Sequence, residues 1–282
     1  MGHAGLIASD ITDAAGSVEY QESGSGQVIV FVPGSFSTGA SWRAISAPLS
    51  ESHRTISTSL CGYGKTTERR RSGGFNIDHE MDVLEAVLAR VGAPAHIVAH
   101  SFGAYVALYL TLCRSPKVLS LTLLEPVMFN LLDFDHEAEL KSQVDAMTSQ
   151  YMADWKNGDR QAVRHVIDFY GGVGTFDAYP PVIQDKVIAC TDTNVLDWQS
   201  PYATSFSATD LARLDVPTVV VCGSTSHEAM KRCNQLLVQH LPQAQLKILD
   251  GANHFMIVTH PSDVGRVIQD HIRGVQTDGI VV

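Results

Sequence analysis

The chain has few of the features that mark a metal protein, a disulfide-bonded protein or a nucleic-acid-binding protein. Its five cysteines are odd in number, and no two of them have C-x-x-C spacing. Zinc sites and disulfide scaffolds usually show such spacings, so we expect neither. Basic residues are also scarce, because 20 Lys and Arg stand against 30 Asp and Glu, for a formal net charge of −10. A surface that binds nucleic acid needs the opposite balance, so we expect no nucleic-acid partner.

Long apolar runs are missing as well. No window approaches the roughly 20 apolar residues that a membrane-spanning helix needs, so no membrane span is expected. Residues 1–10 lack the basic segment and long apolar core of a secretory signal. Together with cysteines that we expect to be unpaired, this favours a cytoplasmic protein. The length of 282 residues fits one large α/β domain, or a domain that carries an insertion.

One cluster of positive charge, Arg69-Arg70-Arg71, stands out against this acidic composition. Runs of like charge usually lie in solvated loops, and this is our interpretation of the cluster. The alternative interpretation is a contact with an acidic substrate or partner.

Short apolar segments recur along the chain and predict β-strands. Most are continuous rather than alternating, which is typical of strands buried on both faces of a sheet. The segments are 28–32, 55–59, 96–100, 119–124, 217–222 and 246–249. Helical patterns lie between them over 77–91, with Asp78 as the expected N-cap, over 229–240 and over 263–272. This alternation predicts a mostly parallel sheet with helices on both faces, and residues 5–21 are expected to add antiparallel edge strands.

The alternation is interrupted between Pro126 and about Asp210, where we expect helices, such as 135–155 and 160–169, and no strand. A helical insertion of this kind predicts a lid over 127–208, mounted on a core formed by 1–126 and 209–282. Phe129, Trp155 and Trp198 are its candidate substrate contacts. Aromatic side chains in such an insertion more often form its own core, so this assignment has a structural alternative.

Residues 96–103 combine a strand, a sharp turn and a helix, with Ser101 at the turn. Serine becomes an effective nucleophile only when its oxygen is exposed and a base lies beside it. A nucleophile elbow exposes the oxygen, and it requires small residues two positions before and two positions after the serine. Ala99 and Gly103 occupy those positions. A serine between small residues is also common in ordinary buried turns, so further residues must support the assignment.

Two other segments follow predicted strands and lie where they can complete a site. His254 follows the last strand, and the carboxyl ends of parallel strands meet at one edge of the sheet. Its imidazole is therefore the candidate base for Ser101. Pro33-Gly34 ends the first parallel strand; by itself it would be a simple turn. Acyl transfer places negative charge on the substrate oxygen, and the backbone N–H groups of Ser35 and Phe102 are the candidate donors for it.

Four of these motifs resemble, in order and spacing, the motifs of the α/β-hydrolase family. Pro33-Gly34-Ser35 is similar to the family's His-Gly-x oxyanion turn, with proline in place of histidine, and Gly62-Tyr63-Gly64 is similar to its Gly-x-Gly turn. Residues 99–103 are similar to its nucleophile elbow, and residues 251–254 are similar to its Gly-x-x-His loop. The resemblance extends over about 26–272. It implies the α/β-hydrolase fold, with the helical lid inserted after the strand that ends at Glu125.

The third member of the implied catalytic triad is not at the family's usual place. There the resemblance calls for a Gly-x-x-Asp pattern after the strand 217–222, but the sequence has Gly223-Ser224-Thr225-Ser226. Some members take the acid from the end of the strand that follows the elbow helix, which is Glu125 here. A buried carboxylate needs a partner such as a histidine N–H, so Glu125 is our first candidate. Glu228, or a Ser–His pair oriented by another group, are the alternatives, and Glu125 could instead bind lid backbone.

These residues predict a carboxylesterase-like serine hydrolase that cleaves an ester, lactone or similar acyl compound through an acyl-enzyme. No metal or organic cofactor is implied. The expected partner is a small, largely apolar substrate, and the protein is expected to be a monomer or homodimer. The same fold also supports hydrolases and lyases of carbon–carbon bonds and cofactor-free oxygenases. A third alternative is a small-molecule-binding protein without turnover, suggested by the displaced acid.

Overall fold

The structure, a computed structural model, describes residues 7–70, 77–133, 137–203 and 206–278. Eight strands form one sheet in the order β1-β4-β6-β5-β7-β8-β9-β10. Their bounds are β1 (Ile7–Ala8), β4 (Gln21–Ser23), β6 (Arg54–Ser57), β5 (Val28–Val32), β7 (Ala95–His100), β8 (Val118–Leu124), β9 (Thr218–Gly223) and β10 (Ala244–Leu249). The strands from β6 to β10 pair in parallel, whereas β1 and β4 form an antiparallel edge. The expected mostly parallel sheet and its antiparallel edge are therefore confirmed.

The strand positions agree closely with the apolar segments of the sequence. β5 coincides with the predicted segment 28–32, and the others differ by one or two residues at their ends. Residues 5–21 contribute more than an edge, because β2 (Ile11–Asp13) and β3 (Gly16–Val18) pair with each other in a separate two-stranded sheet. Continuous apolar runs form the central strands because side chains on both faces of the sheet are buried.

Helices cover both faces of the sheet. Side chains of α1 (Arg43–Leu49) and α12 (Pro261–Asp278) pack in one cluster with Ile29 and Phe31 of β5. Side chains of α2 (Asp78–Val91), α3 (Ser101–Arg114) and α10 (Glu228–His240) pack in the other, together with the intervening strand residues Val28 and Val30. Alternate residues of one strand thus belong to opposite layers, as the pleat of a strand requires.

Asp78 does not cap α2, which corrects the expectation from the sequence. The N-cap residue is Ile77, and no side chain accepts a hydrogen bond there. Asp78 is the first residue of the helix, and its carboxylate lies 3.3 Å from the guanidinium of Arg114. An acidic side chain in the first turn still interacts favourably with the helix dipole. Residues with capping propensity often lie one position inside the helix, and propensity alone does not distinguish the two positions.

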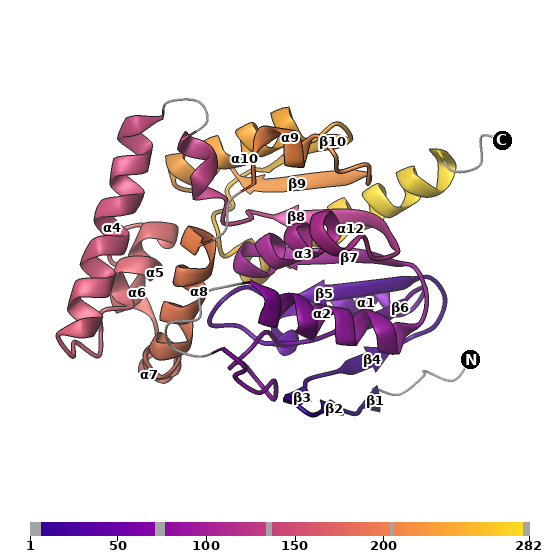
Figure 1. Ribbon diagram of the computed structural model, residues 1–282, viewed down its shortest axis with the longest axis horizontal. Helices are drawn as coiled ribbons and strands as arrows, with labels where there is room; N and C mark the ends of the chain where they lie inside the picture. Colours follow the sequence, from indigo (N-terminus) through magenta and orange to yellow (C-terminus); the bar gives the residue numbers. More distant parts are fainter. Residues whose placement is uncertain (1–6, 71–76, 134–136, 204–205, 279–282) are drawn as a thin grey trace.

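Between β8 and β9 the chain forms helices, and no strand occurs among the described residues of 126–210. The helices are α4 (Ala138–Lys156), α5 (Arg164–Gly171), α6 (Thr175–Ala178), α7 (Pro181–Ala189) and α8 (Thr191–Ala203). Figure 1 shows them gathered on one side of the sheet, away from the chain termini. The expected helix 160–169 begins four residues later than predicted, and residues 135 and 136 lie outside the described part of the chain. Short helices complete the fold: η1 (Gly39–Trp42), η2 (Phe129–Asp133), α9 (Ala208–Leu211) and α11 (Met256–Thr259).

The interpretation of the arginine cluster as a solvated loop was wrong for two of its three residues. Only 7% of Arg70 is exposed, and its guanidinium forms ion pairs with Glu68, Glu80 and Asp197. The side chain of Arg69 is 5% exposed and pairs with a surface carboxylate on β2. The third arginine lies outside the described residues. Carboxylates from distant parts of the chain offset the cost of burying these charges.

Within the described ranges, no helix combines the length and apolar character that crossing a membrane requires.

Candidate active site

Ser101 lies at a tight turn between β7 and α3. Its backbone φ is 54°, a left-handed conformation that costs free energy in a non-glycine residue and holds the side chain at the turn. The turn packs closely against the segment that follows β5. A Cβ atom at Gly103 would lie 2.2 Å from the carbonyl oxygen of Pro33, and one at Gly34 would lie 2.8 Å from the Cβ of Ser101. Only glycine permits this approach of two backbones.

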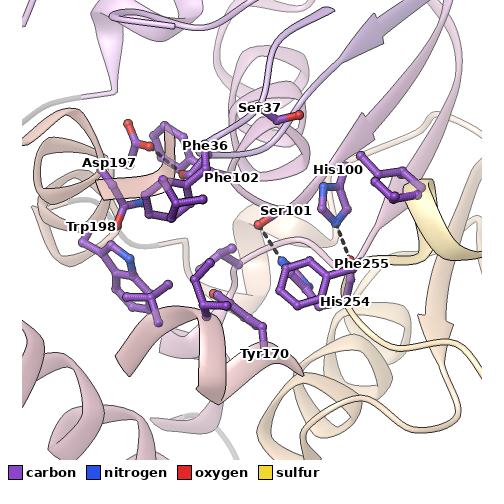
Figure 2. A pocket seen from close by; sticks show the side chains of 18 of the residues that line it. Phe36, Ser37, His100, Ser101, Phe102, Tyr170, Asp197, Trp198, His254 and Phe255 are labelled. Atoms are coloured by element: carbon purple, nitrogen blue, oxygen red, sulfur yellow. Dashed lines mark hydrogen bonds between the residues drawn. The ribbon is translucent and has the colours of Figure 1, made fainter. Parts of the chain in front are cut away.

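The structure brings Ser101, His254 and Glu125 into one hydrogen-bonded chain. The distance from Ser101 Oγ to His254 Nε2 is 2.9 Å, and that from His254 Nδ1 to Glu125 Oε2 is 2.7 Å. Because a carboxylate accepts hydrogen bonds, Nδ1 carries the proton and Nε2 is left to accept from the Ser101 hydroxyl. All three residues are buried, with exposed fractions of 6%, 3% and 0%. Figure 2 shows the Ser101–His254 bond at the base of the pocket.

Glu125 is held by more than His254. The backbone N–H of Gly223 donates to its Oε1 at 2.8 Å, and the hydroxyl of Ser226 donates a short hydrogen bond to the same oxygen. Burial by itself would raise the pKa of Glu125, but the hydrogen bonds and the charge of His254 outweigh it and lower this pKa. The carboxylate is therefore ionised at neutral pH.

Glu228, the second candidate acid, is not part of this chain. It is the first residue of α10, its side chain is 73% exposed, and it lies 2.6 Å from the ammonium of Lys231. Ser226 occupies the position at which the sequence motif calls for an aspartate, and it contacts Glu125 instead. The sequence reasoning missed this role of Ser226, although its place in the Gly-x-x-Ser pattern was a usable signal.

Two further residues that sequence reasoning did not select contact His254, one at its imidazole and one at its backbone carbonyl. The ring of Tyr170 stacks on it with a centroid distance of 4.0 Å and an interplanar angle of 13°. On another side, Nε2 of His100 lies 2.8 Å from the backbone carbonyl of His254. Burial lowers the pKa of His100 to about 3, so this residue is neutral and donates its Nε2–H to that carbonyl. His100 precedes Ser101 in the elbow, and that position was its only sequence signal.

A largely apolar cavity of about 240 Å³ lies above Ser101. Its walls include side chains from α3, α5, α7 and α8, among them Phe102, Val166, Ile167, Val187 and Trp198, together with Val127 and Phe255 from loops. No Lys or Arg side chain is among the described residues that line it, and Asp197 supplies the one formally charged carboxylate in the lining. In the described part of the chain, no group of three or more His, Cys, Asp or Glu side chains is arranged to hold a metal ion.

The candidate residues of the helical segment occupy different places. Trp198 lines the cavity (Figure 2). Phe129 lies behind it, with its ring stacked on that of Trp198 at a centroid distance of 6.1 Å. Trp155 lies at the surface end of α4, where its indole N–H donates to Asp192 at 2.8 Å. Neither Phe129 nor Trp155 is part of the cavity wall, so of the three only Trp198 is positioned to touch a ligand. Ser35 and Phe102 both line the cavity beside Ser101.

The family model of the alpha/beta hydrolase family matches residues 29–267, and the chain belongs to that family. A pimeloyl-[acyl-carrier protein] methyl ester esterase of Neisseria meningitidis (serogroup C / serotype 2a) is 26% identical over 207 residues, covering 71% of this chain and 77% of that protein. Among solved structures, a thermophilic esterase from Thermogutta terrifontis superposes with a TM-score of 0.72 at 19% identity, covering 95% of this chain and 99% of its own. An N-acyl homoserine lactone degrading enzyme, Est816, superposes with a TM-score of 0.73 at 19% identity, covering 93% of this chain and 99% of its own. At such identities the two structures establish the α/β-hydrolase fold alone.

Proposed function

We propose that this protein is a carboxylesterase-like serine hydrolase that cleaves an ester, lactone or similar acyl compound. The observation that carries the proposal is the continuous chain of hydrogen bonds from Ser101 through His254 to Glu125, which opens into an apolar cavity. Nucleophile, base and orienting carboxylate within hydrogen-bond reach form the arrangement that acyl transfer requires. The names of the relatives, an ester hydrolase and a lactone-degrading enzyme, agree with this substrate class.

In the proposed mechanism, His254 Nε2 takes the hydroxyl proton of Ser101 as Oγ bonds to the substrate carbonyl carbon. The carbonyl π electrons move to its oxygen, and the ionised Glu125 stabilises the imidazolium. Collapse of the tetrahedral intermediate breaks the bond to the leaving alcohol, which receives the proton from Nε2. Water then repeats the sequence on the acyl-enzyme, gives a proton to His254 and releases the carboxylic acid, and Ser101 regains its proton.

The negative charge on the tetrahedral intermediate needs hydrogen-bond donors at the elbow. The backbone N–H groups of Ser35 and Phe102 are the proposed donors. In support of this proposal, the turn at Gly34 packs closely against the elbow at Ser101, and Ser35 and Phe102 both line the cavity beside that serine. Preorganised donors of this kind are among the largest contributions to acyl-transfer catalysis.

Residues 127–208 are proposed to form a lid over a core of residues 1–126 and 209–282, and the lid would shape the substrate site. Its helices contribute Val166, Ile167 and Trp198 to the cavity wall. The described residues of the cavity wall are mostly apolar and include no Lys or Arg, which favours a neutral, largely apolar substrate, because a buried anion would have no cation among them to pair with. All five cysteines are unpaired, which agrees with a reducing compartment such as the cytoplasm.

The Ser101→Ala variant tests the proposal. It should retain the fold and lose at least about a thousandfold of its activity towards p-nitrophenyl butyrate. A fluorophosphonate should label the wild-type protein at Ser101 and leave this variant unlabelled. Unchanged ester hydrolysis by Ser101→Ala would refute the assignment. Labelling that fails in an otherwise active enzyme would instead favour the non-acylating chemistry of carbon–carbon bond hydrolases, lyases or oxygenases.

A further inference from the structure

A buried cluster of charged residues joins the helical segment to the turn that carries Ser35. Its centre is Asp197 of α8, which is 2% exposed. The hydroxyls of Ser35 and Tyr63 each donate to Asp197 Oδ2 at 2.6 Å, and Arg70 donates a short hydrogen bond to Oδ1. Arg70 in turn pairs with two more carboxylates in the cluster, so a single guanidinium serves carboxylates from three separate segments. Figure 2 shows Asp197 beside Phe36 at the wall of the cavity opposite His254.

Burying the charged side chains of this cluster costs free energy, so the cluster calls for a functional explanation. Burial raises the pKa of Asp197, and the charge and hydrogen bonds of Arg70 only partly oppose that effect. Replacing buried ion pairs by apolar side chains is often neutral or stabilising, so stability alone gives little reason for such a cluster. The proposed mechanism uses none of these side chains, because Ser35 contributes only its backbone N–H there.

The turn held by Asp197 is strained at the place where the oxyanion donor lies. Phe36, the residue after Ser35, has a φ of 60°, which is unfavourable for a bulky side chain. Such conformations cost on the order of 1–3 kcal/mol and persist only where surrounding contacts enforce them. A contact of the cluster acts directly next to this residue, because the hydroxyl of Ser35 donates to Asp197, which also accepts from the hydroxyl of Tyr63.

We propose that Asp197 is a positioning residue, which acts through the side chain of Ser35 to hold the strained turn so that the Ser35 backbone N–H faces the developing oxyanion. The proposal rests on the proposed serine hydrolase function. Because α8 also carries Trp198 into the cavity, the same helix fixes both the substrate wall and the oxyanion turn. Loss of the Ser35 hydroxyl then releases the turn while leaving the backbone N–H itself in the chain.

The central test compares Ser35→Ala with Ser35→Thr, using p-nitrophenyl butyrate as substrate. Loss of one oxyanion donor costs about a hundredfold to a thousandfold in kcat, so partial misalignment in Ser35→Ala should cost about tenfold to a hundredfold. KM should change little, because the neutral carbonyl of the bound substrate is stabilised much less by this N–H donor than the oxyanion is. Ser35→Thr keeps the hydroxyl and should restore kcat to within about threefold of the wild type.

A matched control separates positioning from general stability. Tyr151→Phe also removes one buried hydroxyl that donates into α8, to Asn194 Oδ1 at 2.9 Å, but it leaves the hydrogen bond between Ser35 and Asp197 in place. It should lower the melting temperature as Ser35→Ala does and leave kcat unchanged. A tetrahedral mimic gives a readout without turnover, because butylboronic acid should bind Ser35→Ala more weakly by the same factor as the loss in kcat.

A double-mutant cycle with Asp197→Ala tests whether Asp197 is the residue through which Ser35 acts. The two substitutions should be strongly non-additive in kcat, because either one breaks the same link. If Asp197→Ala does not fold, the comparison of Ser35→Ala with Ser35→Thr still tests whether the Ser35 hydroxyl positions the turn. A kcat for folded Ser35→Ala within about twofold of the wild type would overturn the positioning role while leaving the hydrolase assignment intact. Additive effects would place the role of Ser35 elsewhere. Hydrolysis that survives Ser101→Ala would instead refute the proposed function and this inference together.

Discussion

The hydroxyl of Ser226 donates a hydrogen bond to Glu125 Oε1, across 101 positions of sequence. The other oxygen of the same carboxylate receives the Nδ1–H of His254. Ser226 thus occupies the motif position that the family usually gives to an aspartate. Its hydroxyl binds Glu125, the carboxylate that follows the neighbouring strand and contacts the histidine. The ends of two adjacent strands, β8 and β9, thus meet at one carboxylate beside the imidazole of His254.

Glu125→Gln should nearly abolish activity. The amide presents an N–H or a neutral oxygen to Nδ1, which disturbs the tautomer of His254 and no longer stabilises its charged form. In the analogous change in a serine protease triad kcat falls by about 10⁴, so a loss of at least about a thousandfold in kcat on p-nitrophenyl butyrate is expected. Glu228→Gln is the matched control and should behave like the wild type, because its side chain is exposed and distant from the chain of hydrogen bonds. Equal losses in the two variants would contradict the proposed role of Glu125.

Moving the acid to Ser226 should restore part of the activity. The double variant Glu125→Ala, Ser226→Asp places a carboxylate on β9's side of the site and removes the one on β8. Because Ser226 already lies within hydrogen-bond reach of Glu125, its replacement should approach the space that Oε1 and Oε2 occupied. We expect kcat to rise at least about tenfold above that of Glu125→Ala alone. Activity no higher than that of the single variant, in a folded protein, would show that the strand end after β9 cannot orient His254.

The stability of the protein should fall in mild acid, partly through His100. The pKa of this residue is about 3 in the folded protein and 6.5 without burial, so the unfolded chain binds a proton that the folded chain excludes between these values. The contribution of the neutral imidazole is thus complete above about pH 6.5 and is lost as the pH falls toward 3. His100→Gln keeps a donor for the carbonyl of His254 and removes the titration. Between pH 7 and pH 5 it should lose about 2 kcal/mol less free energy of unfolding than the wild type, measured by urea titration. Parallel pH dependences would indicate that water reaches the imidazole.

Substrate charge should matter more than chain length. Methyl hexanoate and monomethyl adipate have similar length, but the second carries a carboxylate at neutral pH. No Lys or Arg lines the described cavity wall, and the carboxylate of Asp197 in that wall is already paired with Arg70. We expect kcat/KM to be at least about tenfold higher for the neutral ester, because the anion would lose its hydration without gaining a cation. A preference for the anionic ester, measured by titrating the released acid, would contradict the proposed apolar substrate.

Much of the fold was predictable because local pattern specifies it. Continuous apolar runs such as 28–32 become strands in any parallel sheet, and alternation with amphipathic helices selects the architecture. The predicted ends of the helices were less accurate, as Asp78 illustrates. The position of a cap depends on the backbone geometry of single residues, which the sequence pattern does not resolve. Arg70 was misjudged for a different reason. A run of like charge looks solvated until carboxylates from α2 and α8 come within hydrogen-bond distance, and no local pattern signals that approach.

The sequence by itself determined that Ser101 and His254 follow parallel strands, and strand order then places both at one edge of the sheet. It left three possibilities for the group that orients His254. Only the tertiary structure decided which carboxylate lies beside Nδ1, because that distance joins Glu125 and His254 across 129 positions. It also decided that Asp197 and Ser35 meet, 162 positions apart. Periodicity and motif spacing are local properties of the chain, whereas hydrogen bonds between loops depend on how β8, β9 and α8 pack.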